Sequence, residues 1–100
     1  MGRRVGINVA RKHGTPDEAL GAVITGLRLA KKWSHTEMSH RVGYNEKHLI
    51  AVERGTSSPT HKTIVATAQV FGLRASQLLA RAERKYLKGR PDQRPTNPKR

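Results

Sequence analysis

The chain of 100 residues contains no cysteine, and this absence limits both its chemistry and its crosslinking. Without thiols it can form neither a disulfide nor a thiolate metal site, which fits a reducing compartment. Its apolar runs fall short of the roughly 18 residues that a membrane-spanning helix needs. The first ten residues include basic groups but lack the hydrophobic stretch of a secretory signal. We therefore expect a cytoplasmic protein of bacterial or phage type, associated with the nucleoid.

Acidic and aromatic residues are also few. Seven Asp and Glu stand against 20 Lys and Arg, which gives a formal net charge of +13, and aromatic residues make up 4% of the chain. The scattered acids form no pair suited to acid–base catalysis, and no Ser–His–Asp arrangement emerges. His35 and His40 are five residues apart, off a common helical face, and no His-Glu-x-x-His motif is present. We expect neither an enzyme nor a metal or cofactor site.

The excess positive charge favours a polyanionic partner, with nucleic acid ahead of an anionic membrane surface. Residues 1–14 hold four basic groups and no acid, and residues 86–100 hold five basic groups and one acid. Glycines interrupt the first segment, and three prolines interrupt the second. We expect residues 1–14 to be a flexible basic arm and residues 89–100 to be a disordered basic tail. The segment 15–88 is expected to fold as one domain.

Helix-capping patterns follow the N-terminal arm. Thr15-Pro16-Asp17-Glu18 combines a hydroxyl cap, a proline at the first helical position and a glutamate three residues after the cap, which is a capping box. Apolar residues then recur at helical spacing up to about residue 32. Ser34-His35-Thr36-Glu37 has the pattern of a second capping box and predicts a second helix that ends at Gly43.

Three further helices are indicated after Gly43. Asn45 caps the first of them and Gly55 ends it, with Leu49 and Val52 directed inward. The other two are expected over about 61–71 and 75–88, the last beginning after Arg74, which is a poor cap. No segment alternates at a period of two over the length of a strand. The pattern predicts an all-α fold of five helices.

A three-residue turn, Gly43-Tyr44-Asn45, joins the second and third expected helices. Gly43 can take the positive φ of a sharp turn, and the small Ser39 leaves room for the third helix to cross the second. The third helix then presents its outer side to solvent, with Glu46, Lys47, Ile50 and Ala51 on it. Such an exposed helix can enter a DNA major groove. The alternative is an ordinary helical hairpin in a small bundle, but the net charge favours DNA.

From Leu20 to Leu79 the sequence resembles the lambda-repressor/Cro-like helix-turn-helix family, often called the Xre family. The matching residues lie in all five expected helices: Leu20-Gly21, Ile24, Leu27-Arg28, Ser34, Glu37-Met38, Gly43, Leu49, Val52-Glu53-Arg54-Gly55, Pro59, Ile64, Ala68, Phe71-Gly72-Leu73 and Leu78-Leu79. The resemblance implies a compact five-helix DNA-binding domain with its helix-turn-helix at the second and third helices.

The resemblance also implies which residues read bases. They lie on the exposed side of the third helix: Asn45, Glu46, Lys47, Ile50 and Ala51. Lys47 can donate to guanine O6 and N7, Glu46 can accept from cytosine N4, and Ala51 can touch a thymine methyl. Glu46 and Ile50 depart from the glutamine, arginine and other polar residues that are common at such positions in the family. The alternative for each is a solvated helix face.

Other roles are expected beside the reading helix. The resemblance implies an internal ion pair of Arg28 with Glu53, against the alternative of two solvated surface charges. Phosphate contacts are expected at the start of the second helix and around the loop between the third and fourth: His35, Thr36, Arg54, Thr56, Ser57, Ser58, His61 and Lys62. In the N-terminal arm, Arg3 and Arg4 would suit the minor groove. The alternatives are phosphate contacts without base preference and a tail that only aids solubility.

An apolar edge on the fifth helix suggests assembly. The residues are Leu79, Ala82, Tyr86 and Leu87, which either pair with a second copy or close the domain's own core. We expect a homodimeric, sequence-specific transcriptional regulator that occupies an inverted repeat in double-stranded DNA. The competing hypotheses are a nonspecific basic nucleic-acid-binding protein and an antitoxin-type protein whose main partner is another protein.

Overall fold

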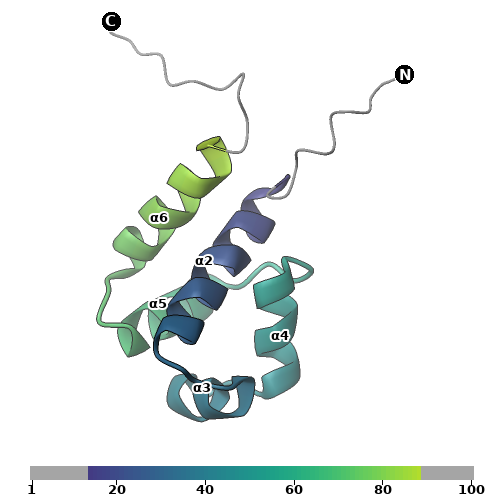
Figure 1. Cartoon of the computed structure of the whole chain (residues 1–100), viewed down its shortest axis with the longest axis vertical. Helices are drawn as coiled ribbons and strands as arrows, with labels where there is room; N and C mark the ends of the chain where they lie inside the picture. Colours follow the sequence, from purple (N-terminus) through teal and green to yellow (C-terminus); the bar gives the residue numbers. More distant parts are fainter. Residues whose placement is uncertain (1–13, 89–100) are drawn as a thin grey trace, which may run out of the picture.

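The computed structural model describes residues 14–88, and five α-helices are its only regular secondary structure over that range. Figure 1 labels them α2 (Pro16–Ala30), α3 (His35–Val42), α4 (Glu46–Arg54), α5 (His61–Val70) and α6 (Ala75–Lys88). The predicted all-α fold of five helices is confirmed. The predicted N-terminal arm, apart from Gly14, lies outside the described residues, as do the C-terminal tail, Arg3 and Arg4.

The helix caps follow the sequence pattern, with one correction. At α2 the capping box is complete: the Glu18 amide donates to Thr15 Oγ1 at 3.0 Å, and the Thr15 amide donates to Glu18 Oε1 at 3.2 Å. At α3 the Glu37 amide donates to Ser34 Oγ at 3.0 Å, but the Glu37 carboxylate accepts from Arg41 Nε at 2.9 Å. The cation one turn later attracts this carboxylate away from the cap, so the predicted second capping box was wrong in its reciprocal half.

The end of α2 lies earlier than the sequence predicted. The helix stops at Ala30 rather than near residue 32, because Lys32 has a left-handed backbone with φ of 61°. The chain then turns back, and the Trp33 amide donates to the Arg28 carbonyl at 3.2 Å. Trp33 stacks on Phe71 with ring centroids 5.5 Å apart, and the Arg41 guanidinium carbon lies 4.5 Å from the centroid of the Trp33 ring. This cluster ties the α2–α3 turn to the end of α5.

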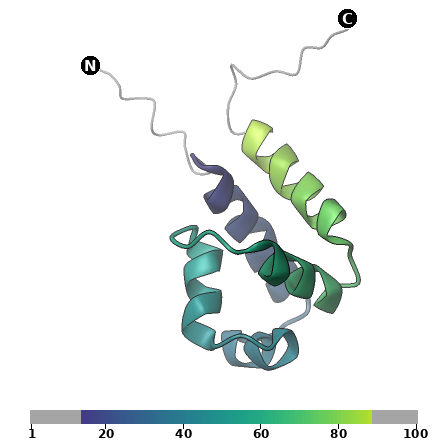
Figure 2. The ribbon, with the colours of Figure 1, turned by 180° about the vertical axis from the view of Figure 1, so that it is seen from behind.

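The core forms around α2, which packs against α6 on one side and against α4 on the other (Figures 1 and 2). Its buried apolar side chains come from all five helices: Ala19, Leu20, Ile24, Met38, Leu49, Val52, Ala68, Leu78 and Ala82. Ala82 is thus a core residue, but it also lines a groove with Leu79 and Tyr86, so its place at a dimer interface stays a prediction. It follows Leu78 by one helical turn and points to the same side of α6.

Candidate nucleic-acid interface

The α3–α4 turn has the geometry that its glycine predicted. Gly43 has φ of 89°, in the left-handed region, and its amide donates to the Ser39 carbonyl at 2.9 Å. Asn45 caps α4 by accepting from the His48 amide at 2.8 Å. Ser39 is buried and its hydroxyl donates to the Thr36 carbonyl at 2.9 Å. The turn and the small side chain together let α4 leave α3 abruptly and cross it.

Gly21 sets how closely α4 approaches α2. A Cβ atom at Gly21 would lie 2.6 Å from the Val52 carbonyl oxygen and would overlap the Glu53 carbonyl oxygen. Only glycine therefore permits this backbone contact. Gly21 was among the residues that match the family, but the sequence did not show why glycine is needed at this position. The contact fixes the distance between the two helices along the side of α4 that faces the core.

Glu53 is the centre of a buried polar cluster that joins α2, α3 and α4. Its carboxylate accepts from Arg28 Nε at 2.7 Å, from Arg28 Nη2 at 3.1 Å and from Thr25 Oγ1 at 3.0 Å. The Arg28 and Glu53 side chains are only 9% and 5% exposed, so they are not solvated surface charges. Arg28 Nη1 also donates to the Trp33 carbonyl at 2.9 Å. The cluster holds the end of α4 against α2.

His35 belongs to the same cluster, which the sequence did not reveal. Its Nε2 lies 3.0 Å from Glu53 Oε1, and its side chain is 32% exposed. The imidazole, predicted as a phosphate contact, is turned toward Glu53. What the start of α3 offers an anion is then its first-turn backbone amides and the positive end of the helix dipole.

The outer side of α4 holds the five predicted base-reading residues. Asn45, Glu46 and Lys47 are exposed, while Ile50 and Ala51 are half-buried. The Asn45 side chain is occupied as the helix cap. The Glu46 carboxylate accepts from Thr36 Oγ1 at 3.1 and 3.2 Å, so it links the starts of α3 and α4. The sequence missed this link because the two residues lie ten positions apart on different helices.

Apart from His35 and Thr36 at the start of α3, the predicted phosphate-contacting residues lie in or beside the loop between α4 and α5. Arg54, Thr56, Ser58, His61 and Lys62 are exposed, and Ser57 is half-buried. Two of the hydroxyls already make internal hydrogen bonds. Ser58 Oγ donates to Asp17 Oδ2 at 2.7 Å, and Thr56 Oγ1 donates to the Ala51 carbonyl at 3.2 Å. The loop is therefore braced against α2 and α4, with cationic side chains on either side of it.

Two negative findings concern other kinds of site. Over residues 14–88, no cluster of three or more His, Cys, Asp or Glu side chains is arranged to hold a metal ion. In the same part of the chain, no helix combines the length and the apolar character needed to cross a membrane.

Comparison with solved structures identifies relatives of this fold. Two crystal structures of the clp gene regulator ClgR from Corynebacterium glutamicum match the chain. One has a TM-score of 0.66 at 21% identity and covers 72% of this chain and 92% of that one. The other has a TM-score of 0.68 at 20% identity and covers 78% and 84%. This chain shares the fold of ClgR. No protein-family model and no curated protein matches it.

Proposed function

We propose that this protein is a sequence-specific, double-stranded DNA-binding transcriptional regulator of the Xre type that reads the major groove with α4. The observation that carries the proposal is the way α4 is held. The buried Arg28–Glu53 pair and the Gly21 contact fix its inner side, while its outer side remains accessible. A helix fixed in this way can present side chains to base edges. The fold shared with a gene regulator supports the same function.

Within this proposal the residues of α4 have different tasks. Lys47 is the exposed hydrogen-bond donor and suits guanine O6 and N7, while Ile50 and Ala51 suit thymine methyl groups. Glu46 accepts a hydrogen bond from Thr36 and so fixes the start of α3 relative to the start of α4. A carboxylate has further lone pairs and can accept from cytosine N4 while it keeps this contact. The reading surface then combines one cation, one acid and two aliphatic side chains.

Phosphate contacts on both sides of α4 would position it on the duplex. The first-turn amides of α3 can bind one phosphate, since they lie at the positive end of the helix dipole. At the other end of α4, Arg54 and the α5 residues His61 and Lys62 are exposed beside the loop. Such contacts supply affinity and register but carry no sequence information.

We further propose a homodimer formed through one edge of α6. Leu79 is 41% exposed and lies in a groove between α6 and the starts of α2 and α5, whose other lining residues include Leu20, Ile64, Ala82 and Tyr86. A second copy related by a two-fold axis could cover this groove. Leu87, predicted on the same edge, lines a different groove on the other side of α6. A dimer would place two α4 helices on half-sites about 34 Å apart and act by occupying an operator.

Selection of bound sequences from random duplexes tests the proposal. A palindromic consensus with half-sites about one helical turn apart is expected. Substituting Lys47→Ala should relax the preference at one symmetric pair of positions. Recovery of no consensus would favour a nonspecific basic nucleic-acid-binding protein. Absence of duplex binding altogether would favour the antitoxin-type hypothesis. Sedimentation of wild type and Leu79→Glu tests the dimer separately, because this variant leaves α4 unchanged.

A further inference from the structure

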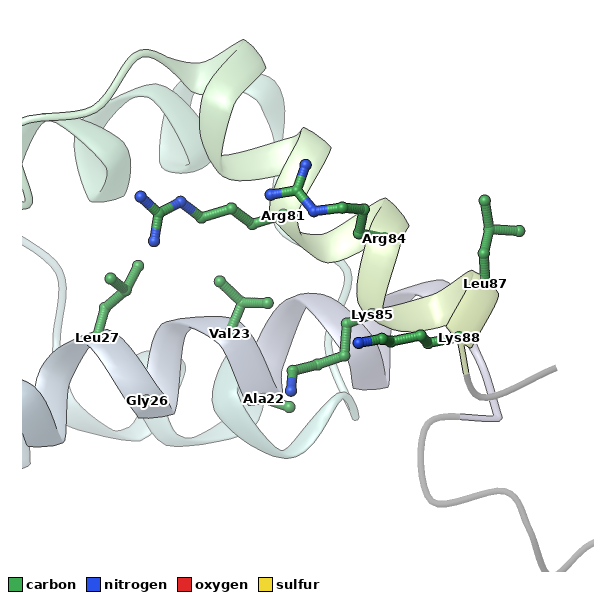
Figure 3. A pocket seen from close by; sticks show the side chains of 9 residues that line it. All are labelled: Ala22, Val23, Gly26, Leu27, Arg81, Arg84, Lys85, Leu87 and Lys88. Atoms are coloured by element: carbon green, nitrogen blue, oxygen red, sulfur yellow. The ribbon is translucent and has the colours of Figure 1, made fainter. Parts of the chain in front are cut away.

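A groove of about 680 Å³ lies between α2 and α6. Figure 3 shows its two walls: Val23, Gly26 and Leu27 come from α2, and Arg81 and Arg84 come from α6 on the opposite side. Lys85 and Lys88 extend the cationic wall toward the end of α6. Among residues 14–88, no acidic side chain lines the groove. The surface is therefore a half-buried apolar strip beside four cations.

This groove is separate from the proposed DNA-reading surface. Gly21 contacts α4, and Gly26 follows it by five residues, which at 3.6 residues per turn places it roughly 140° around α2. The groove and α4 thus lie on different sides of the same helix. A molecule in the groove would leave the outer side of α4 free.

Gly26 leaves open space on this side of α2. It lies in the interior of the helix, where glycine is unfavourable relative to alanine. A Cβ atom at Gly26 would meet nothing within 4 Å, so no contact in the described domain requires glycine there. Gly21, in the same helix, has such a contact. A missing side chain on an open groove lets another backbone approach closely.

The chemistry of the walls selects among possible occupants. Phosphates match the four cations but gain nothing from Val23 and Leu27. A second copy docked groove to groove would bring no carboxylate from this groove to pair with the four cations. An amphipathic helix with an apolar stripe flanked by carboxylates complements both walls. The cationic wall from Arg81 to Lys88 is about 10 Å long, at 1.5 Å per residue, which matches roughly two turns of such a helix.

We propose that the α2–α6 groove binds an acidic amphipathic helix of a partner protein. The apolar stripe of the partner helix lies on Val23, Gly26 and Leu27. The carboxylates of the partner helix pair with the four cations of α6: Arg81, Arg84, Lys85 and Lys88. This interaction does not depend on DNA binding. If the protein acts as a DNA-bound regulator, as proposed above, the groove is a second surface at which another protein binds it.

The experiment uses the full chain, labelled with ¹⁵N, and three synthetic peptides of about 14 residues, close to the length at which isolated helices become stable. The first has a leucine stripe flanked by glutamates. The second replaces each glutamate by lysine, and the third scrambles the first so that no stripe remains. We expect only the first to bind, and to shift the amide resonances of Gly26, Leu27, Arg81 and Arg84 without shifting those of α4.

Two variants locate the binding site without unfolding the domain. Gly26→Leu fills open space and improves helix propensity, so its melting temperature should equal or exceed that of wild type while peptide affinity falls about tenfold or more. The double variant Arg81→Glu/Arg84→Glu should lower the affinity for the glutamate peptide by a similar factor and raise the affinity for the lysine peptide. Ala80→Leu and Arg74→Glu, which alter exposed positions outside the groove, serve as matched controls and should leave the affinity unchanged.

Several outcomes would overturn the proposal. They include no binding of the glutamate peptide, equal binding of the lysine peptide, and binding that Gly26→Leu leaves intact. If the peptide fails to bind and Arg81→Glu/Arg84→Glu lowers duplex affinity, the groove is a phosphate-contacting surface. If the peptide fails to bind and Gly26→Leu turns a dimer into a monomer, the groove is a self-association surface. Because the peptide titration contains no DNA, failure of the proposed DNA-binding function would not affect its result.

Discussion

Removing the Glu53 carboxylate should destabilise the domain more than any other single change at the polar cluster. Glu53→Ala deletes the acceptor of two Arg28 hydrogen bonds, of the Thr25 hydroxyl and of the His35 contact. It leaves the Arg28 guanidinium, 9% exposed, without its counter-charge. Loss of one partner from a buried pair costs about 3–5 kcal/mol. A domain of this size has a free energy of unfolding on the order of 4–11 kcal/mol.

The assay is urea unfolding followed by circular dichroism. Glu53→Ala should lower the free energy of unfolding by about 3–5 kcal/mol, and duplex binding should fall in proportion to the folded fraction that remains. The control is Glu37→Ala, which breaks the exposed pair with Arg41, where the two side chains are 46% and 49% exposed. Such an i,i+4 pair contributes only about 0.3–0.5 kcal/mol.

A double substitution separates the stranded charge from the lost pair. Arg28→Met/Glu53→Leu removes both charges and keeps similar volumes, so it should recover most of the stability that Glu53→Ala loses. Thr25 retains the Gly21 carbonyl as a partner in this variant, at 2.8 Å in the wild type. A loss below about 1 kcal/mol for Glu53→Ala would show that Arg28 is not left as an isolated buried charge, because such a charge destabilises a folded protein by more than that.

Three further predictions concern single positions on α2, the turn and α4. Gly21→Ala should lower the free energy of unfolding in urea by about 1–3 kcal/mol through overlap with the α4 backbone. The matched Gly26→Ala, in open space, should raise it by about 0.5–1 kcal/mol; equal effects would contradict the close approach at Gly21. Gly43→Ala should lose about 1–2 kcal/mol to left-handed strain, and Gly43→Asn less; a neutral Gly43→Ala would show that the turn relaxes. Lys47→Ala should reduce affinity for a selected duplex by about 1–3 kcal/mol in binding assays while stability stays unchanged, and an equal loss on scrambled duplex would indicate a phosphate contact instead.

Local signals in the sequence were enough to predict most of the fold. Capping residues and helix-ending glycines depend on neighbours within a few positions, so Thr15, Asn45, Gly43 and Gly55 located their helix ends well. The α2 end was misplaced because a lysine, not a glycine, takes the left-handed conformation there. Lys32 has no intrinsic preference for that conformation, so tertiary contacts of Trp33 must offset its strain.

Contacts between distant residues were harder to predict. The Arg28–Glu53 pair was predicted only from the resemblance. No pattern of neighbouring residues predicted that Thr25 and His35 also contact Glu53. The burial of Ala82 could not be assigned from the sequence, because periodicity identifies an apolar side of a helix but not which part of that side the core uses. The Glu46–Thr36 link depends on how α3 and α4 cross, which the turn length constrains without specifying side-chain partners.

If α4 gives this protein a sequence preference on DNA, its affinities for a selected and a scrambled duplex must differ when both are measured over a range of salt concentrations. Wild type and Lys47→Ala are titrated with the selected duplex and with a scrambled duplex of equal length between 50 and about 200 mM salt. At physiological salt we expect wild type to bind the selected duplex at least about 10³-fold more tightly than the scrambled duplex, and Lys47→Ala to lower this ratio. Equal affinity for both duplexes, falling steeply with salt in both proteins, would contradict this expectation.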